Sequence, residues 1–132
     1  MEKCVVLPPP ECAKTPGLDI IAYDLDAHTV ELTFDGKREF ANPIGIVQGG
    51  FLSAMLDDTM GLASATAMNV GEFAPTLGLN VQFHRPAKIG KLTGKGRITM
   101  QAREHEIICA PEAGVEIPAQ RLVTHTPGPE GV

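Results

Sequence analysis

Alternation of apolar and polar residues marks several segments of the chain as half-buried β-strands. The clearest is "PTLGLNVQFHRPA" (75–87), where each odd position from 77 to 83 is leucine, valine or phenylalanine. Residues 91–103 alternate less strictly, and their glycines suggest bending or bulging. Besides these two strands, the same pattern predicts strands at 18–26, 27–34 and 121–126.

A helical period replaces the alternation from about residue 48 to residue 68. Apolar residues there recur at three- and four-residue spacing, and Gly71 follows as a helix breaker. The chain thus consists of strands, one long helix, and strands again. This order predicts an α+β domain whose helix packs on an antiparallel sheet.

Three segments lack either pattern. "LPPP" and "TPG" predict an irregular N-terminal arm over 1–17, and "PGPEGV" predicts a frayed C-terminal tail over 127–132. Residues 104–118 offer one short apolar run and two prolines, so either the segment is irregular or its strand register is locally shifted. The domain itself is predicted to span 18–126.

Composition limits the partners that the protein can have. The 132 residues include 11 basic and 16 acidic side chains, and this net charge of −5 gives no argument for nucleic acid or an anionic membrane. No apolar stretch is long enough to span a membrane, and three cysteines without a metal-type spacing favour a reducing compartment. The four histidines show no ligand spacing, so no metal is expected. We expect a cytoplasmic protein.

A helical wheel separates two faces of the predicted helix. Steps of about 100° per residue group most apolar side chains into a stripe expected to face the sheet: Phe51, Leu52, Met55, Leu56, Thr59, Leu62 and Ala63. The opposite face carries small residues and one acid: Gly50, Ser53, Ala54, Asp57, Gly61 and Ser64. Small residues allow a ligand or a second backbone to approach Asp57. A solvent-facing Asp57 without a role is the alternative, and a phase error of one residue would exchange it with Asp58.

The paired glycines at the helix start form a candidate site for an anionic oxygen. The first amides of a helix have no partner within it and lie at the positive end of its dipole. Because Gly49 and Gly50 have no Cβ, a ligand carbonyl can reach those amides. A turn leading into the helix is the plainer interpretation of the pair.

The spacing of the glycines and the acid restricts how they can act together. Gly50 and Asp57 lie about 10.5 Å apart along the helix axis at 1.5 Å per residue. One carbonyl cannot contact both groups of one helix at that separation. Two antiparallel copies of the helix could place Gly50 of one chain beside Asp57 of the other, which predicts a site shared across a dimer.

"NPIGIVQGGFLSAMLDDTMG" followed by "PTLGLNVQFHRPAKIGKL" resembles the hotdog-fold acyl-CoA thioesterases of the phenylacetate-pathway type. The resemblance covers about residues 18–103 and rests on Asn42, the paired glycines, an acid seven residues after the second glycine, and a strand ending in "RPAKIG". It implies a long central helix wrapped by a curved antiparallel β-sheet, in subunits that assemble as a homodimer or homotetramer.

The resemblance also implies roles for individual residues. Gly49 or Gly50 would polarise the thioester carbonyl, and Asp57 would be the nucleophile or the general base that activates water. Asn42 would position the water or the carbonyl, and Thr76 would assist beside the acid.

One position departs from the family. Gln48 stands where these thioesterases usually have histidine, and glutamine hydrogen-bonds but carries no proton charge near neutral pH. We therefore expect altered or weakened activity rather than none.

The expected activity is hydrolysis of an acyl-CoA thioester to a carboxylate and a free thiol. Coenzyme A is part of that substrate, so no cofactor is expected. Arg85 and Lys88, in a basic stretch over 83–97, are candidate contacts for its phosphates, although a solvated loop also explains the stretch. A non-catalytic acyl-CoA or lipid-binding hotdog protein is the alternative. A dehydratase is a third, and that chemistry usually needs a histidine, which this helix lacks. The sequence does not indicate which acyl group the substrate carries.

Overall fold

The computed structural model describes residues 10–69, 75–83, 85–100, 104–110 and 120–125. Its elements are helix α2 (Glu11–Lys14), strands β1 (Asp19–Asp24) and β2 (Thr29–Gly36), the 3-10 turn η1 (Arg38–Phe40), helix α3 (Gly49–Ala65), and strands β3 (Thr76–Val81), β4 (Gly90–Met100), β5 (Glu104–Ala110) and β6 (Gln120–His125). Residues 1–9, Gly71 and the predicted tail at 127–132 lie outside the described residues.

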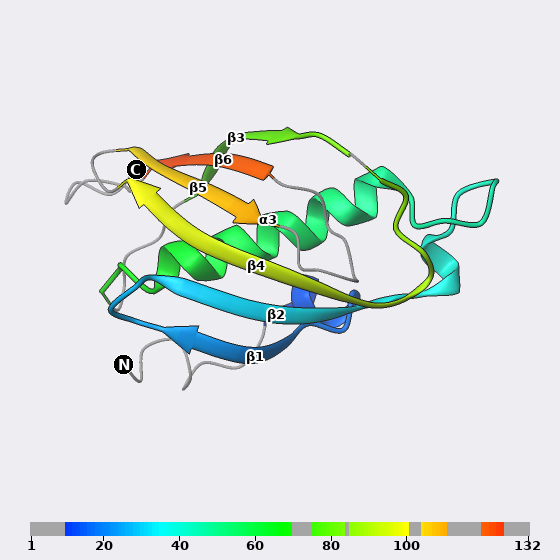
Figure 1. Cartoon of the computed structure of the whole chain (residues 1–132), viewed down its shortest axis with the longest axis horizontal. Helices are drawn as coiled ribbons and strands as arrows, with labels where there is room; N and C mark the ends of the chain where they lie inside the picture. The colour runs from blue at the N-terminus through cyan, green and yellow to red at the C-terminus, as the bar shows by residue number, and fades with distance from the viewer. Residues whose placement is uncertain (1–9, 70–74, 84, 101–103, 111–119, 126–132) are drawn as a thin grey trace.

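The six strands form one antiparallel sheet in the order β1-β2-β4-β5-β6-β3. The sheet curves around α3, which lies along its inner face, and β1 and β3 are its two end strands (Figure 1). The prediction of an α+β domain with one long helix against an antiparallel sheet is confirmed. The arrangement is that of the hotdog fold.

The core lies between α3 and the inner face of the sheet. Along β2 the side chains of Val30, Leu32 and Phe34 are buried, while the residues between them are only half-buried, as alternation on a pleated strand requires. Helix α3 contributes seven buried residues: Leu52, Met55, Leu56, Thr59, Met60, Ala63 and Ser64. Full burial of one large apolar side chain contributes about 1.5–3 kcal/mol, so this layer holds the helix in place.

Two glycines let β4 cross α3 closely. A Cβ added to Gly94 would lie 2.7 Å from the Thr59 hydroxyl oxygen, and one added to Gly96 would lie 3.0 Å from the Thr59 carbonyl oxygen and 3.3 Å from the Ala63 side chain. The pairing of β2 with β4 runs without interruption through both glycines. The glycines therefore make room for the helix, and the register shift of β4 falls later, between Ile98 and Met100.

The buried face of α3 is rotated from the predicted one. Met60 and Ser64 are buried, although Ser64 was assigned to the outer face, whereas Phe51 is 36% exposed and Leu62 is only partly buried. Strands β4 and β5 pack on α3 in addition to β2, so the sheet covers more of the helix than a flat layer would. The Phe51 ring instead stacks on Phe40, with ring centroids 4.3 Å apart.

For residues 104–118 the sequence left open whether the segment is irregular or a strand in a shifted register. Strand β5 forms over 104–110 and pairs with β4 on one side and β6 on the other, while 111–118 lie outside the described residues. Three other predictions about elements need correction. Strand β3 ends at Val81 rather than 87, and α3 ends at Ala65 rather than 68. The arm at 1–17, expected to be irregular, contains α2, where the buried Ala13 packs.

Replacing Gly96 by alanine should destabilise the fold. The new methyl would meet backbone and side-chain atoms of Thr59 and Ala63 that cannot move independently, and overpacking of this kind costs about 1–3 kcal/mol. Urea denaturation measures the loss. Gly61→Ala is the matched control, because nothing lies within 4 Å of that site and alanine favours the helix. Equal stabilities for the two variants would contradict the close crossing.

Candidate functional site

The start of α3 presents two amides without an acceptor. Gln48 precedes the helix in an extended conformation, and its carbonyl accepts the amides of Phe51 at 3.0 Å and Leu52 at 3.2 Å. Within the described residues, the amides of Gly49 and Gly50 have no hydrogen-bond acceptor. Both can therefore donate to an oxygen from outside the chain, at the positive end of a helix dipole.

The two glycines have different surroundings. A Cβ on Gly49 would lie 3.0 Å and 3.1 Å from ring carbons of Phe83, so the ring packs directly against this glycine. A Cβ on Gly50 would meet nothing within 4 Å. The open side of Gly50 thus leaves room for a ligand or a second polypeptide.

The loop before α3 is held by Asn42. Its side-chain oxygen accepts the amides of Ile44 at 3.1 Å and Ile46 at 3.2 Å, and its own backbone amide donates to the Ile46 carbonyl at 2.8 Å. The oxygen is therefore used within the loop, and the side-chain NH2 is the group left to act on a substrate. Gln48 is exposed, and its side chain does not cap the helix.

Asp57 and Thr76 are brought together by two different elements. The Thr76 hydroxyl on β3 donates to one carboxylate oxygen of Asp57 on α3 at 2.8 Å. This contact fixes one carboxylate oxygen and leaves the other available. The helical wheel predicted that Gly50 and Asp57 lie on one outer face of the helix. Gly50 is exposed and Asp57 is partly exposed, in agreement with that prediction.

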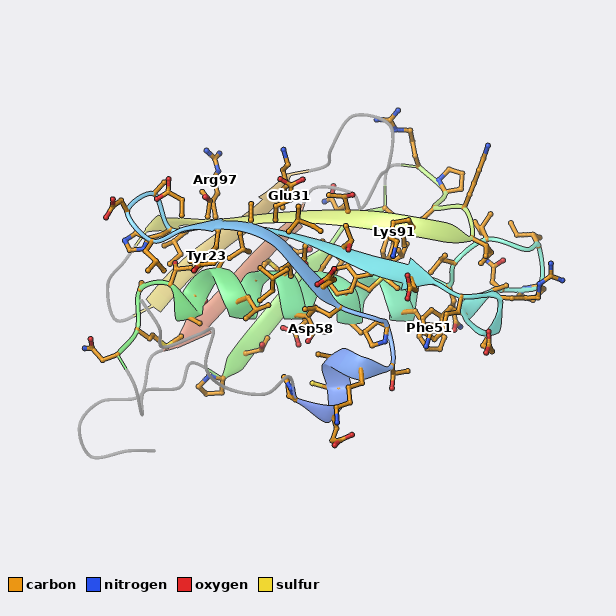
Figure 2. All side chains as sticks on the ribbon, turned by 90° about the horizontal axis from the view of Figure 1, so that it is seen from below. Tyr23, Glu31, Phe51, Asp58, Lys91 and Arg97 are labelled. Atoms are coloured by element: carbon orange, nitrogen blue, oxygen red, sulfur yellow. The ribbon has the colours of Figure 1, made fainter. Side chains whose placement is uncertain are left out.

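Asp58 has a different environment from its neighbour. Burial, with repulsion from Asp57 as a smaller cause, raises the pKa of Asp58 to about 6. Figure 2 shows Asp58 and Phe51 on the side of α3 that is turned away from the sheet. The two adjacent carboxyl groups therefore differ: Asp57 has a hydroxyl donor, whereas Asp58 is a half-buried carboxyl that favours its neutral form.

The chain after β3 passes beside the helix start. The Val47 amide donates to the Ala87 carbonyl at 2.9 Å, and Ile46 and Lys88 form an isolated bridge. Arg85 and Lys88 are both exposed on this segment and so lie near the loop that leads to Gly49. Lys91 is engaged elsewhere: it donates to Asp35 at 2.8 Å, and this contact raises the pKa of Lys91.

A hollow of about 560 Å³ lies elsewhere, lined by residues of β1, β2 and β4 that include Tyr23, Glu31 and Arg97 (Figure 2). None of its lining residues belongs to α3 or to the loop before it, so the hollow is separate from the candidate site.

Among the described residues no group of histidine, cysteine, aspartate and glutamate is arranged to hold a metal ion. In the same part of the chain, no helix has the length and apolar character needed to cross a membrane.

Sequence reasoning missed one residue of the site. Phe83 was taken only as the last apolar position of a strand, but β3 ends at Val81 and the Phe83 ring lies on Gly49. Pro86, three residues later, is a signal that the strand ends early, since proline is rarely compatible with a paired strand. The contact with Gly49 itself joins distant segments and leaves no local signal.

Comparisons with known proteins agree with this fold. A family model described as the thioesterase superfamily matches residues 44–105. A phenylacetic acid degradation-related protein from Ralstonia eutropha JMP134 is 33% identical, with 91% of this chain and 92% of that chain covered and a TM-score of 0.82.

Two more distant structures share the fold. The PaaI protein of the Escherichia coli phenylacetic acid degradation operon is 23% identical over 90% of this chain and 86% of that chain, with a TM-score of 0.74. A Haemophilus influenzae thioesterase is 20% identical over 86% and 80%, with a TM-score of 0.73. No curated protein sequence matches the chain.

Replacing Asp58 by asparagine should stabilise the protein at alkaline pH. Because the pKa is raised from 3.8 to about 6, folding favours the neutral carboxyl, and the charged form destabilises the folded state as pH rises through about 6. The full shift corresponds to about 3 kcal/mol, and partial exposure reduces the expected gain to about 1 kcal/mol at pH 8. The gain should shrink as the pH falls to 4.5.

Denaturation of parent and variant at several pH values measures this difference. Asp57→Asn is the control, because it weakens the contact with Thr76 and should not stabilise the fold. A pH-independent difference for Asp58→Asn would show that its charge is not the cause.

Proposed function

The chain belongs to the thioesterase superfamily, and on that basis we propose that it hydrolyses acyl-CoA thioesters to a carboxylate and free coenzyme A, in a site shared by two subunits. The observation that carries the proposal is the hydrogen bond of Thr76 to Asp57, on the helix whose first two amides lack an acceptor among the residues that the structure describes. An acid and an oxyanion site are the two components that thioester hydrolysis requires.

The amides of Gly49 and Gly50 serve the carbonyl oxygen. As a tetrahedral intermediate forms, negative charge develops on that oxygen, and fixed N–H donors stabilise it without reorganisation. Loss of one such donor typically lowers turnover about 10²–10³-fold. The Asn42 NH2 group lies on the same loop and assists in positioning the carbonyl or the water.

Asp57 acts on the carbonyl carbon by one of two routes. As a nucleophile, its free carboxylate oxygen forms an anhydride with the acyl group and expels the CoA thiolate, and water then cleaves the anhydride. As a general base, it takes a proton from water, and hydroxide adds to the carbonyl carbon before the thiolate leaves. In both routes the Thr76 hydroxyl orients the carboxylate.

Helix geometry supports a second subunit in the site. Gly50 and Asp57 of one helix are about 10.5 Å apart, more than one carbonyl can bridge. The exposed residues Gly50, Ala54 and Gly61 form a face of α3 on which another helix can pack closely. The carbonyl is held by one chain and attacked with the carboxylate of the other.

Coenzyme A carries phosphates, and the exposed cations Arg85 and Lys88 lie on the segment beside the helix start. This position suits a substrate whose thioester reaches Gly49 while its nucleotide stays at the surface. Lys91, in contrast, is paired with Asp35 at 2.8 Å.

A binding protein without hydrolytic activity is the second candidate. Gln48, exposed beside the two amides, offers no titratable group where related thioesterases usually have histidine. Such a protein would bind acyl-CoA saturably and release no thiol, so a colorimetric thiol assay separates the two functions.

Asp57→Asn should lower kcat for an acyl-CoA substrate by at least about 100-fold, because asparagine can neither attack nor accept a proton. Steady-state thiol release over a panel of acyl-CoA substrates measures the loss. Asp58→Asn is the matched control, since the neighbouring carboxyl has no bond to Thr76, and it should retain most of the parent rate at pH 7.5. Equal rates for Asp57→Asn and the parent would exclude the role of Asp57.

Mixing two inactive variants tests the shared site. Asp57→Asn keeps the amides, and Gly50→Val keeps the acid but places a side chain where the ligand must approach. Refolded together in equal amounts, they should recover about a quarter of the parent activity, because half of the dimers are mixed and each has one intact site. If the mixture stays as inactive as its components, acid and amides act within one chain or the site has another composition.

A further inference from the structure

Phe83 has a position that the fold does not require. Its ring is 48% exposed and is not part of the hydrophobic core. The buried part of the ring lies on Gly49, with ring carbons 3.0, 3.1 and 3.7 Å from the position of an added Cβ. A large aromatic ring that stays half in water at a candidate site is available to contact a ligand.

A backbone hydrogen bond ties the segment that follows Phe83 to the loop before α3. Phe83 follows β3, and only four residues later the Ala87 carbonyl accepts the Val47 amide at 2.9 Å. On the helix side the ring occupies the space that a Gly49 side chain would fill. Phe83 is therefore a wall beside the first amides of α3, where the chain after β3 passes the helix start (Figure 1).

Distance connects the ring to the reacting carbonyl. A carbonyl oxygen that accepts the Gly49 or Gly50 amide lies about 3 Å from that nitrogen. Two ring carbons lie 3.0 and 3.1 Å from the point where a Gly49 Cβ would stand, and that point is one bond from the α-carbon that carries the amide nitrogen. Acyl carbons attached to a carbonyl bound at these amides can thus lie against the exposed part of the ring.

We propose that Phe83 determines acyl specificity: its ring is the wall against which the first carbons of the acyl group lie, so that the site prefers straight-chain thioesters and disfavours acyl groups branched next to the carbonyl. This inference rests on the proposed function. The sulfur side of the carbonyl is the same in every acyl-CoA, so only the acyl carbon varies at this wall. A methylene that packs on the ring gains about fourfold in affinity, whereas a branch meets the ring itself.

The absence of a side chain then has a different explanation at each of the paired glycines. Gly49 lacks a side chain because the Phe83 ring occupies that space, and Gly50 lacks one because the substrate or the second subunit must approach there.

The test compares hexanoyl-CoA with 2-methylhexanoyl-CoA in the parent, in Phe83→Ala and in Phe83→Leu. The parent should prefer the straight chain by at least about tenfold in kcat/KM, and Phe83→Ala should reduce that preference about tenfold, because the wall is removed. Phe83→Leu should be intermediate. Phe51→Ala is the matched control: Phe51 is a second partly exposed phenylalanine near the helix start, but its ring stacks on Phe40, and the preference should not change.

Binding of the corresponding ketone analogues, in which a methylene replaces the sulfur, is measured on the same proteins. A preference that Phe83→Ala leaves unchanged, in hydrolysis or in binding, would overturn the inference. If the parent releases no thiol but binds the straight analogue more tightly in a manner that depends on Phe83, the specificity role stands and the proposed hydrolysis fails.

Discussion

The close crossing of β4 over α3 is the constraint on which the rest of the molecule depends. Gly94 and Gly96 place the strand so near Thr59 and Ala63 that a Cβ at either position would require its neighbours to shift. With the strand this near, the sheet curves around the helix rather than lying flat on it. The curvature carries the last strand of the sheet, β3, to the position where Thr76 reaches Asp57.

The same helix serves both the core and the site, and its two faces meet different physical demands. The inner face fills space, and replacing any of its large side chains would leave a cavity. The outer face combines small residues with carboxyl groups. Asp57 and Asp58 are adjacent in sequence, yet one receives a hydrogen bond from Thr76, whereas burial raises the pKa of the other to about 6. Placement on a helix therefore decides which of two identical groups is suited to chemistry.

Much of the fold could be predicted from the sequence because its signals are local. Alternation in β2 and the long apolar period of α3 depend only on neighbouring residues, and both elements formed as expected. The sequence left strand β5 undecided because it is held by partners on both sides rather than by a pattern of its own. The predicted position of the buried face around α3 was partly wrong. The curvature of the sheet decides which side of the helix is covered, and that curvature is a property of the whole domain.

The site follows the same division. Gly50 and Asp57 could be placed on one helix face from their spacing, while the role of Thr76 came from the family resemblance and its contact became visible only in the structure. The Phe83 ring on Gly49 joins segments more than thirty residues apart, and no local rule anticipates it.

In the proposed mechanism, the location of Thr76 on an end strand would couple assembly to chemistry. Strand β3 pairs with β6 on one side, and no other described strand pairs with it on the other. The hydroxyl that donates to the carboxylate is thus anchored to one of the two margins of the sheet. Any polypeptide that associated along that margin would stiffen it, so the acid would reach its working orientation most fully in the assembled protein, and a separated subunit would keep the fold while losing part of its catalytic alignment.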